Sequence, residues 1–262
     1  MTGPGGMSAA ELRSCCAAAY EHDLVALVLG PSYHPGGADL TRRLARALDL
    51  RPGERVLDVA SGPGTTARLL AEEFGVTVEG IEAGARSAGR ARAGGAARRL
   101  DGRVRFLCGD AQALPFAGAS FDAVVCECSF CTFPDKSAAA AEVARVLRPG
   151  GRVGVTDVTV EPGRLEPQLQ TLAARVACLA DARPAGAYEA ILAGAGLRVT
   201  RTEPHADALA GMIDQVDARL RALDLVGLPG VDLSATRPYM AAAARAVADG
   251  TAGYVLLMAV KD

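Results

Sequence analysis

Two glycines and a later acid form the first candidate chemical site in the sequence. Gly62 and Gly64 lie in the run VLDVASGPG, residues 56–64, where a short apolar segment passes into a tight turn. Glycine lets the backbone turn sharply and approach a ligand closely, at the start of the helix that follows. Glu82 ends the next apolar run, at a spacing from Gly62 where a carboxylate can bind both hydroxyls of a ribose. Together these features predict a nucleotide-binding site.

The glycine turn departs from the three-glycine pattern of NAD-binding proteins. Ala67 occupies the third position of the pattern in GPGTTA. Because alanine is tolerated there, the turn by itself leaves a dinucleotide open as the ligand.

Cysteine is the second residue type that suggests chemistry. The seven cysteines lack a secretory context, so we expect free thiols rather than a disulfide framework. Soft thiolates bind soft metals and metalloids, whereas a free buried cysteine most commonly acts as a small hydrophobe, which we expect for Cys108. A zinc site at Cys126, Cys128 and Cys131 is disfavoured because no fourth ligand lies nearby in the sequence.

Tyrosines and histidines near the N-terminus are candidates for polar contacts to a second substrate. They are Tyr20, His22, Tyr33 and His34. His34 would serve as a general base for a hydroxyl acceptor, and a plain loop histidine is the alternative interpretation.

Alternating strands and helices must position these residues. Apolar runs predict strands at 56–60, 77–81, 104–108, 121–126 and 152–158, separated by helices at 65–74, 84–100 and 136–147. Strands this short and apolar indicate a parallel sheet covered on both faces, so we predict an α/β, doubly wound, mostly parallel fold.

The remaining segments predict one domain with helical additions. We expect a disordered tail at 1–8, an N-terminal helical cap at 9–52 with helices at 9–29 and 38–48, a cofactor-binding core at 53–160 and substrate-side elements at 161–262. Within the last part we predict helices at 167–180, 185–195, 207–223 and 235–248, a strand at 197–203, and an antiparallel edge strand at 253–260.

Composition excludes several function classes. Half of the 262 residues are apolar and the formal net charge is -2, which suits one α/β domain and offers no basic face for nucleic acid. The best apolar run, 254–260, is too short to cross a bilayer, and the opening segment is too short and interrupted for a signal peptide. We therefore expect a cytoplasmic monomer or homodimer with a small-molecule substrate and no membrane partner.

Residues 55–158 resemble the class I S-adenosylmethionine-dependent methyltransferases. VLDVASGPG is similar to their first motif, VEGIE to the second and GDAQALPF to the third, while FDAVVCECSF and RVLRPGGRVGVTDV resemble later segments. The resemblance implies a Rossmann-like seven-stranded sheet and S-adenosylmethionine as cofactor.

The same resemblance implies roles for individual residues. Asp58 would order the glycine loop, Glu82 would bind the ribose, and Asp110 would accept a hydrogen bond from the adenine amino group beside the Ala111 N–H. The full implied cofactor set is Asp58, Ala60, Ser61, Gly62, Gly64, Glu82, Asp110, Ala111 and Cys126, with Glu127 also near the sulfonium.

Two cysteine-containing segments resemble those of arsenite methyltransferases. They are residues 126–136, CECSFCTFPDK, and the later VACLADARP. By position, this implies Cys128 and Cys178 as ligands of trivalent arsenic, and the pair Cys15 and Cys16 resembles an N-terminal pair of that family, which makes Cys16 the third candidate. An expected further cysteine segment before the first motif is absent.

Three hypotheses follow from the sequence. The first is a metalloid or thiol methyltransferase that uses Cys128 and Cys178 with Cys16. The second is an O-, N- or C-methyltransferase for a small organic metabolite, with structurally inert cysteines, and the third is a cofactor-binding module without catalysis.

Overall fold

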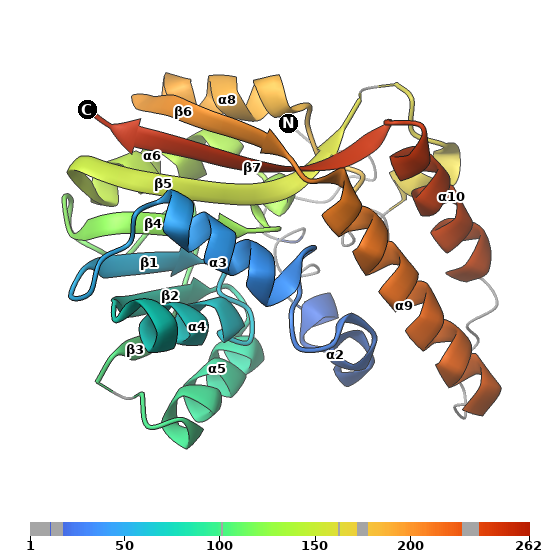
Figure 1. The fold of residues 1–262 in the computed structure, drawn as a ribbon, viewed down its shortest axis with the longest axis horizontal. Helices are drawn as coiled ribbons and strands as arrows, with labels where there is room; N and C mark the ends of the chain where they lie inside the picture. The colour runs from blue at the N-terminus through green and yellow to red at the C-terminus, as the bar shows by residue number, and fades with distance from the viewer. Residues whose placement is uncertain (1–10, 12–17, 101, 162, 172–177, 227–235) are drawn as a thin grey trace.

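A seven-stranded sheet flanked by helices organises the molecule (Figure 1). The computed structural model describes residues 11, 18–100, 102–161, 163–171, 178–226 and 236–262. The strands are β1 (Arg55–Val59), β2 (Thr77–Glu82), β3 (Val104–Cys108), β4 (Phe121–Glu127), β5 (Leu147–Val160), β6 (Leu197–Pro204) and β7 (Ala252–Lys261), in the order β3-β2-β1-β4-β5-β7-β6. Strands β1 to β5 run parallel, and β7 pairs antiparallel with β5 and β6. The predicted doubly wound, mostly parallel fold is confirmed.

Helices cover both faces of the sheet, which explains the apolar strands. In Figure 1, α3 (Gly37–Ala47), α4 (Thr65–Phe74) and α5 (Ala85–Ala97) lie in front of the sheet, and α6 (Lys136–Val146) and α8 (Ala185–Gly194) lie behind it. Side chains on both faces of a central strand are then removed from water, so Val56 and Leu57 are fully buried although they point to opposite faces.

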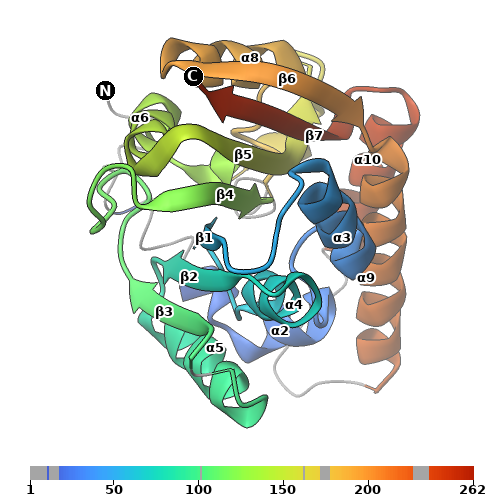
Figure 2. The ribbon, with the colours of Figure 1, turned by 60° about the vertical axis from the view of Figure 1, so that its left-hand side comes forward.

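A second group of helices lies beyond the carboxyl ends of the parallel strands. In Figure 1, α2 (Asp23–Leu29), α9 (Ala206–Val226) and α10 (Thr236–Ala248) lie to the right of the sheet, and Figure 2 shows α9 and α10 on that side again. Helix α9 contacts both other helices. Ligands of open α/β sheets bind at this end of the strands. These three helices therefore lie next to the end of the sheet at which a ligand would bind.

Two predicted helices are wrong in extent. The segment predicted as one helix at 9–29 is interrupted at His22, whose side chain accepts a hydrogen bond from the Leu24 backbone N–H and so caps α2. The helix predicted at 167–180 is described only as a single 3₁₀ turn, η2 (Pro167–Gln170). Cys178 has a φ of 65°, which a right-handed helix does not allow, and residues 172–177 lie outside the described part of the chain.

The last strand is antiparallel, as predicted, but it is not an edge strand. β7 inserts between β5 and β6, so β6 forms the edge of the sheet. The sequences explain this order, because the apolar segment GYVLLMAV needs burial, whereas the arginines, threonines and glutamate of β6 tolerate solvent.

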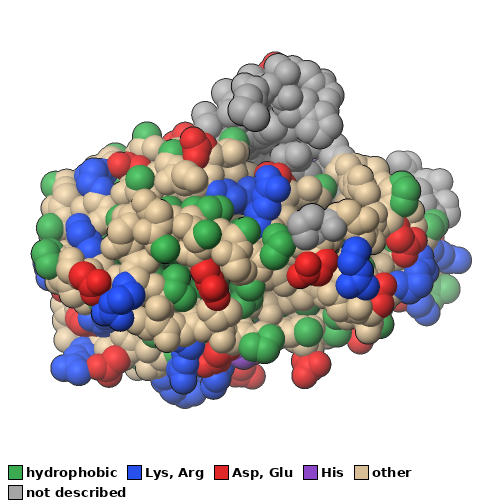
Figure 3. All heavy atoms as spheres, turned by 90° about the horizontal axis from the view of Figure 1, so that it is seen from above, with side chains coloured by type: hydrophobic (Ala, Val, Ile, Leu, Met, Phe, Trp, Pro, Cys, Tyr) green, Lys and Arg blue, Asp and Glu red, His purple; other side chains and the backbone are tan. Residues whose placement is uncertain are grey.

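Surface exposure and surface charge test further predictions made from the sequence. Cys108 is exposed on the outer strand β3, so its prediction as a buried hydrophobe is wrong. Lys and Arg side chains are interspersed with Asp and Glu on the face drawn in Figure 3. Within the described residues, none of the helices combines the length and the apolar character needed to cross a bilayer. The predicted tail at 1–8 lies outside the described residues.

Candidate active site

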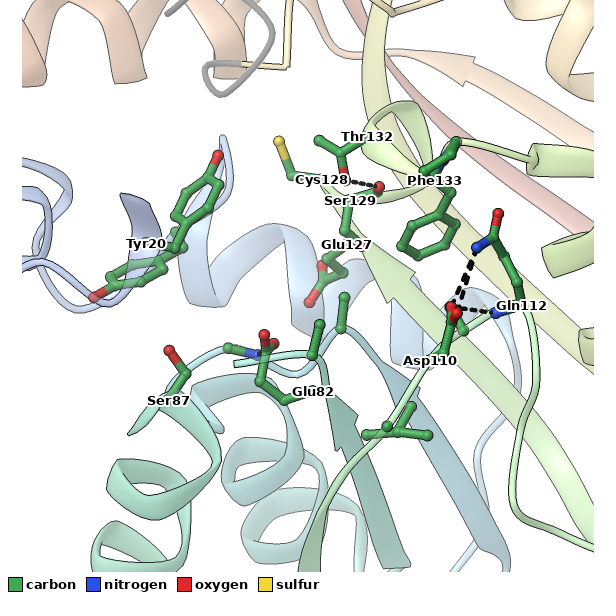
Figure 4. A pocket seen from close by; sticks show the side chains of 18 residues that line it. Tyr20, Glu82, Ser87, Asp110, Gln112, Glu127, Cys128, Ser129, Thr132 and Phe133 are labelled. Atoms are coloured by element: carbon green, nitrogen blue, oxygen red, sulfur yellow. Dashed lines mark hydrogen bonds between the residues drawn. The ribbon is translucent and has the colours of Figure 1, made fainter. Parts of the chain in front are cut away.

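A cavity of about 130 Å³ lies at the carboxyl ends of β1, β2 and β4 (Figure 4). Its walls combine the end of the sheet with Tyr20 and Tyr33, which lie before and after α2 in the sequence. The lining residues are Tyr20, Tyr33, Ala60, Gly62, Ile81, Glu82, Ala83, Ser87, Gly109, Asp110, Ala111, Gln112, Glu127, Cys128, Ser129, Thr132, Phe133 and Pro134. We call this space the cofactor cavity.

The glycine turn divides into residues that line the cofactor cavity and residues that support it. Ala60 and Gly62 line the cavity, and both have positive φ angles, 57° and 51°. Ser61 and Gly64, also predicted as cofactor residues, are not among its lining residues. Gly64 is required for packing instead, because a Cβ at this position would lie 2.5 Å from Cζ of Phe106.

Glu82 lines the cofactor cavity and orders the glycine turn at the same time. Its Oε2 accepts a hydrogen bond from the Gly62 N–H at 2.8 Å, and its Oε1 accepts one from the Gly84 N–H at 3.0 Å. Burial raises the pKa of this carboxyl. A carboxylate has about four acceptor positions, so Glu82 keeps acceptor capacity for a ligand's hydroxyl groups.

Asp110 and Ala111 follow β3 and also line the cofactor cavity, as predicted positions of an adenine contact. Oδ1 of Asp110 accepts a hydrogen bond from the Gln112 N–H at 2.9 Å, and the Gln112 side chain lies against the same carboxylate (Figure 4). This local turn fixes the direction of the carboxylate at the cavity wall.

Glu127, at the end of β4, is held by side chains from two other elements. Its Oε2 accepts hydrogen bonds from Thr41 Oγ1 at 2.9 Å and from Thr66 Oγ1 at 2.7 Å. Its Oε1 is buried and has no hydrogen-bond partner among the described residues. Because Glu127 lines the cofactor cavity, the unpaired oxygen is a candidate contact for a cationic ligand group.

His34 supports this carboxylate and does not contact the cavity as a general base would. Its Nε2 lies 3.5 Å from Oε2 of Glu127, and its ring is buried between Pro35 and Thr41. His34 is not among the residues that line the cofactor cavity. His22, the other candidate histidine, is the exposed N-cap of α2.

The cofactor cavity is acidic. Glu82, Asp110 and Glu127 line it, and no Lys or Arg does so in the described part of the chain. Asp58, also predicted as a cofactor residue, is buried and does not line the cavity, and its Oδ2 has no partner among the described residues. Burial raises the pKa of Asp58, and the nearby carboxyls of Glu127 and Glu82 raise it further. An acidic cavity of this kind favours a ligand with positive charge and disfavours an anion.

Cys126 does not line the cofactor cavity, contrary to its predicted place there. The side chain is 2% exposed, and its Sγ lies 3.1 Å from Oγ of Ser129. Successive residues of a strand point to opposite faces, so Glu127 reaches the cavity while Cys126 is directed into the core.

A second cavity of about 140 Å³ adjoins the first, between the strand ends and the helices α2, α9 and α10. Three residues line both spaces: Tyr20, Tyr33 and Cys128. The second is otherwise lined by Leu29, Pro35, Val158, Cys178, Leu179, Leu209, Met212, Ile213, Val216, Tyr239, Met240 and Ala243. We call this space the acceptor chamber.

Two of the predicted acceptor cysteines meet in the acceptor chamber. Sγ of Cys178 lies 3.4 Å from the Cys128 carbonyl oxygen and 3.7 Å from the Tyr20 hydroxyl. Hydrogen bonds from the thiols of Cys128 and Cys131 lower the pKa of Cys178. Cys16 lies outside the described residues. Among the described residues no group of three or more His, Cys, Asp or Glu is placed to hold a metal ion.

Sequence reasoning missed the threonines that hold Glu127 and the tyrosine on α10. Thr41 and Thr66 lie on helices α3 and α4, and only the packing of these helices directs them to the end of β4. Tyr239 lines the acceptor chamber from α10. None of the three residues carries a sequence signal that sets it apart from other helical residues.

The central part of the chain is similar to a known protein family. Residues 56–151 match the family described as methyltransferase domain. This segment of the chain is therefore similar to that methyltransferase family. It holds the glycine turn, Glu82, Asp110 and Glu127, so the family match and the cofactor cavity concern the same residues.

Curated methyltransferases are similar to about half of this chain. Nocamycin O-methyltransferase of Saccharothrix syringae is 41% identical over 145 residues, which cover 55% of this chain and 51% of the relative. Demethylmenaquinone methyltransferase of Thermus thermophilus is 42% identical over 130 residues, covering 48% of this chain and 58% of the relative. The chain spans about half the length of the curated relatives it matches.

Solved structures share the fold of nearly the whole chain. Phosphoethanolamine N-methyltransferase 2 of Haemonchus contortus, solved with S-adenosyl-L-methionine, has a TM-score of 0.83 and 21% identity, covering 98% of this chain and 60% of that one. The [4+2]-cyclase SpnF has a TM-score of 0.75 and 24% identity, covering 97% of each chain. A cyclase on this architecture shows that the fold alone does not determine the reaction.

Proposed function

We propose that the protein binds S-adenosylmethionine in the cofactor cavity and transfers its methyl group to a small acceptor in the adjoining chamber. The acidic cavity wall carries this proposal. S-adenosylmethionine has a positive sulfonium and a positive ammonium group, which carboxylates stabilise, whereas the pyrophosphate of NAD would face three carboxylates without a lining Lys or Arg in the described residues.

The residues of the cavity fit the parts of this cofactor. Glu82 would accept hydrogen bonds from the ribose hydroxyls, and Asp110 with Ala111 would bind the adenine edge. The unpaired Oε1 of Glu127 would bind the cationic end, with Thr41 and Thr66 holding the other oxygen in place. When bound, the cofactor supplies an electrophilic methyl group for in-line displacement.

The protein's own contribution to the reaction is alignment and the exclusion of water. The acceptor chamber is largely apolar, and Tyr20, Tyr33 and Cys128 lie where it adjoins the cofactor cavity. An acceptor in the chamber would therefore present its reactive atom past these three side chains.

Calorimetry with S-adenosylmethionine, S-adenosylhomocysteine and NAD tests the cofactor assignment. We expect both sulfur nucleosides to bind and NAD to bind at least about a hundredfold more weakly, since an unpaired buried charge costs several kcal/mol. Absence of binding by either sulfur nucleoside, or preferential binding of NAD, would overturn the assignment.

Transfer itself is tested separately from binding. A screen of phenols, thiols, amines and trivalent arsenic with methyl-labelled cofactor should yield a labelled product. Binding of S-adenosylmethionine without turnover on any acceptor class would refute methyl transfer and support the third hypothesis, a cofactor-binding module.

A thiophilic acceptor, such as trivalent arsenic, is the second candidate. It is favoured by the meeting of Cys128 and Cys178 in the acceptor chamber, because soft thiolates suit a soft metalloid. The relatives compared above are named for organic acceptors, which favours a small organic acceptor over trivalent arsenic.

Three serine variants separate the two acceptor classes. Cys128→Ser and Cys178→Ser should abolish transfer to trivalent arsenic if thiolates hold it, while Cys108→Ser, exposed on β3 and outside both cavities, is the matched control. Full transfer to arsenic by the first two variants, with cofactor binding intact, would refute the thiolate hypothesis.

A further inference from the structure

The acceptor chamber has no charged side chain among its described lining residues. Its polar side chains are limited to three tyrosines and two cysteines: Tyr20, Tyr33, Tyr239, Cys128 and Cys178. A charged substrate group placed there would lose its water without gaining an ionic partner. The chamber therefore disfavours acceptors that carry a phosphate, a carboxylate or an ammonium group.

One of these tyrosines has an unsatisfied hydroxyl. The hydroxyl oxygen of Tyr239 is buried and makes no hydrogen bond with any described residue. In contrast, the Tyr20 hydroxyl already lies against Cys178 Sγ. Buried polar groups are nearly always hydrogen-bonded, and an exception at a cavity wall indicates a partner supplied by a ligand.

The position of Tyr239 shows which part of an acceptor it would contact. Tyr239 lines the acceptor chamber from α10, but it does not line the cofactor cavity. Tyr20, Tyr33 and Cys128 occupy the shared boundary between the two spaces instead. Tyr239 is thus suited to hold a polar atom of the acceptor that is distinct from the atom receiving the methyl group.

We propose that Tyr239 is a specificity-determining residue that hydrogen-bonds a hydroxyl or carbonyl oxygen of an uncharged, largely apolar acceptor. The proposal rests on the proposed function, because it assigns the acceptor to this chamber. The apolar wall formed by Leu209, Met212, Ile213 and Met240 would contact the remainder of the molecule.

Binding of three aromatic probes tests the substrate class. The full chain, saturated with S-adenosylhomocysteine at pH 7.5, is titrated with 2-naphthol, naphthalene and 2-naphthoate. We expect 2-naphthol to bind roughly three- to tenfold more tightly than naphthalene, the value of one net hydrogen bond, and 2-naphthoate to bind most weakly. The proposal would be overturned if 2-naphthoate bound as tightly as 2-naphthol or more tightly, or if 2-naphthol showed no measurable binding at millimolar concentration.

The variant Tyr239→Phe tests the residue. It should bind 2-naphthol and naphthalene with nearly equal affinity, and it should keep or slightly raise the melting temperature, because removing an unpaired buried hydroxyl costs no hydrogen bond. Tyr188→Phe is the structural comparison. Its hydroxyl donates to the Val158 carbonyl and accepts from the Arg183 N–H, so its loss should lower the melting temperature.

A preference for 2-naphthol that persists in Tyr239→Phe would show that the Tyr239 hydroxyl does not bind this probe. A melting temperature that falls as in Tyr188→Phe would show that the hydroxyl is bonded within the protein. Either result would overturn the proposal. The titrations are repeated without S-adenosylhomocysteine. If that nucleoside fails to bind but the naphthol preference and its loss in Tyr239→Phe remain, the proposed function fails while the chamber's preference stands.

Discussion

At the scale of single residues, the carboxylates of the cofactor cavity differ in how they are held. Glu82 is fixed by backbone N–H groups of Gly62 and Gly84, whereas Glu127 is fixed by the hydroxyls of Thr41 and Thr66. In each case the protein fixes the acid and leaves acceptor capacity towards the cavity. Fixed acceptors lose little entropy when a ligand binds, which is the advantage of a preorganised site.

Replacing Glu82 with glutamine should weaken binding of S-adenosylmethionine by roughly 10- to 100-fold. A glutamine cannot accept both backbone hydrogen bonds with its oxygen alone, and hydrogen bonds to charged groups are worth about 1.5–3 kcal/mol. Glu79→Gln, on the same strand but paired with Arg55 outside the cavity, should bind the cofactor normally. Calorimetry measures both, and an unchanged affinity in the Glu82 variant would contradict the assigned contact.

The sequence could predict residues whose role depends on local spacing. Gly62, Glu82 and Asp110 were found at the cavity because each ends or follows a strand, and strand ends meet at one edge of a sheet. Cys126 was wrongly placed there by one residue of strand alternation. Tyr239 could not be predicted, because its place depends on how α10 packs, which no local pattern encodes.

At the scale of elements, the junction of β1 and α4 depends on close packing against Phe106 of β3. Gly64 caps α4 in the left-handed region at a φ of 75°, and Gly80 of β2 also lies against the Phe106 ring. A Cβ at Gly80 would lie 2.5 Å from Cδ1 of that ring. The two glycines thus let an aromatic residue pack directly against the backbone that forms the cofactor turn.

The variant Gly64→Ala should destabilise the protein by roughly 2–4 kcal/mol and lower Tm by about 5–15 °C. Left-handed backbone is unfavourable for alanine, and the added methyl group overlaps the Phe106 ring. Gly89→Ala, within α5 and with no atom within 4 Å of the added Cβ, should instead stabilise slightly. Differential scanning calorimetry compares them, and equal Tm values would refute the packing argument.

Most elements could be predicted because their sequences decide their structure locally. The predicted bounds of α4 and β3 match those observed, since each has a clear period and a glycine or turn at its ends. The helices predicted at 9–29 and 167–180 were wrong where a cap at His22 and a left-handed Cys178 interrupt an apolar period. The neighbours of β7 depend on long-range pairing, which periodicity does not report.

At the scale of the whole molecule, buried acids make stability depend on pH. Burial raises the pKa of Asp157 to about 7, and it also raises the pKa of Asp58 and of Glu82. A raised pKa in the folded state means that the folded protein binds protons more tightly than the unfolded chain. The stabilisation is complete below the usual carboxyl pKa of about 4 and is lost as the pH rises through the folded value.

We therefore expect Tm of the ligand-free protein to fall between pH 5 and pH 7.5. The lowered pKa of the Cys178 thiol has the opposite effect on Tm. We expect the three carboxyls together to outweigh this single thiol. Carboxyls with lowered pKa, such as Glu73 and Glu142, act only below this range. Thermal scans across the range measure the effect, and a Tm that rises steadily with pH would contradict it.

The insertion of β7 between β5 and β6 also governs the order of events during synthesis. β6 ends at Pro204, and among the described strands it pairs with β7 alone, which does not begin until Ala252. Until that later segment leaves the ribosome, one edge of β5 in the nascent chain stays unpaired. The partly folded domain must keep this edge from pairing with a neighbouring polypeptide.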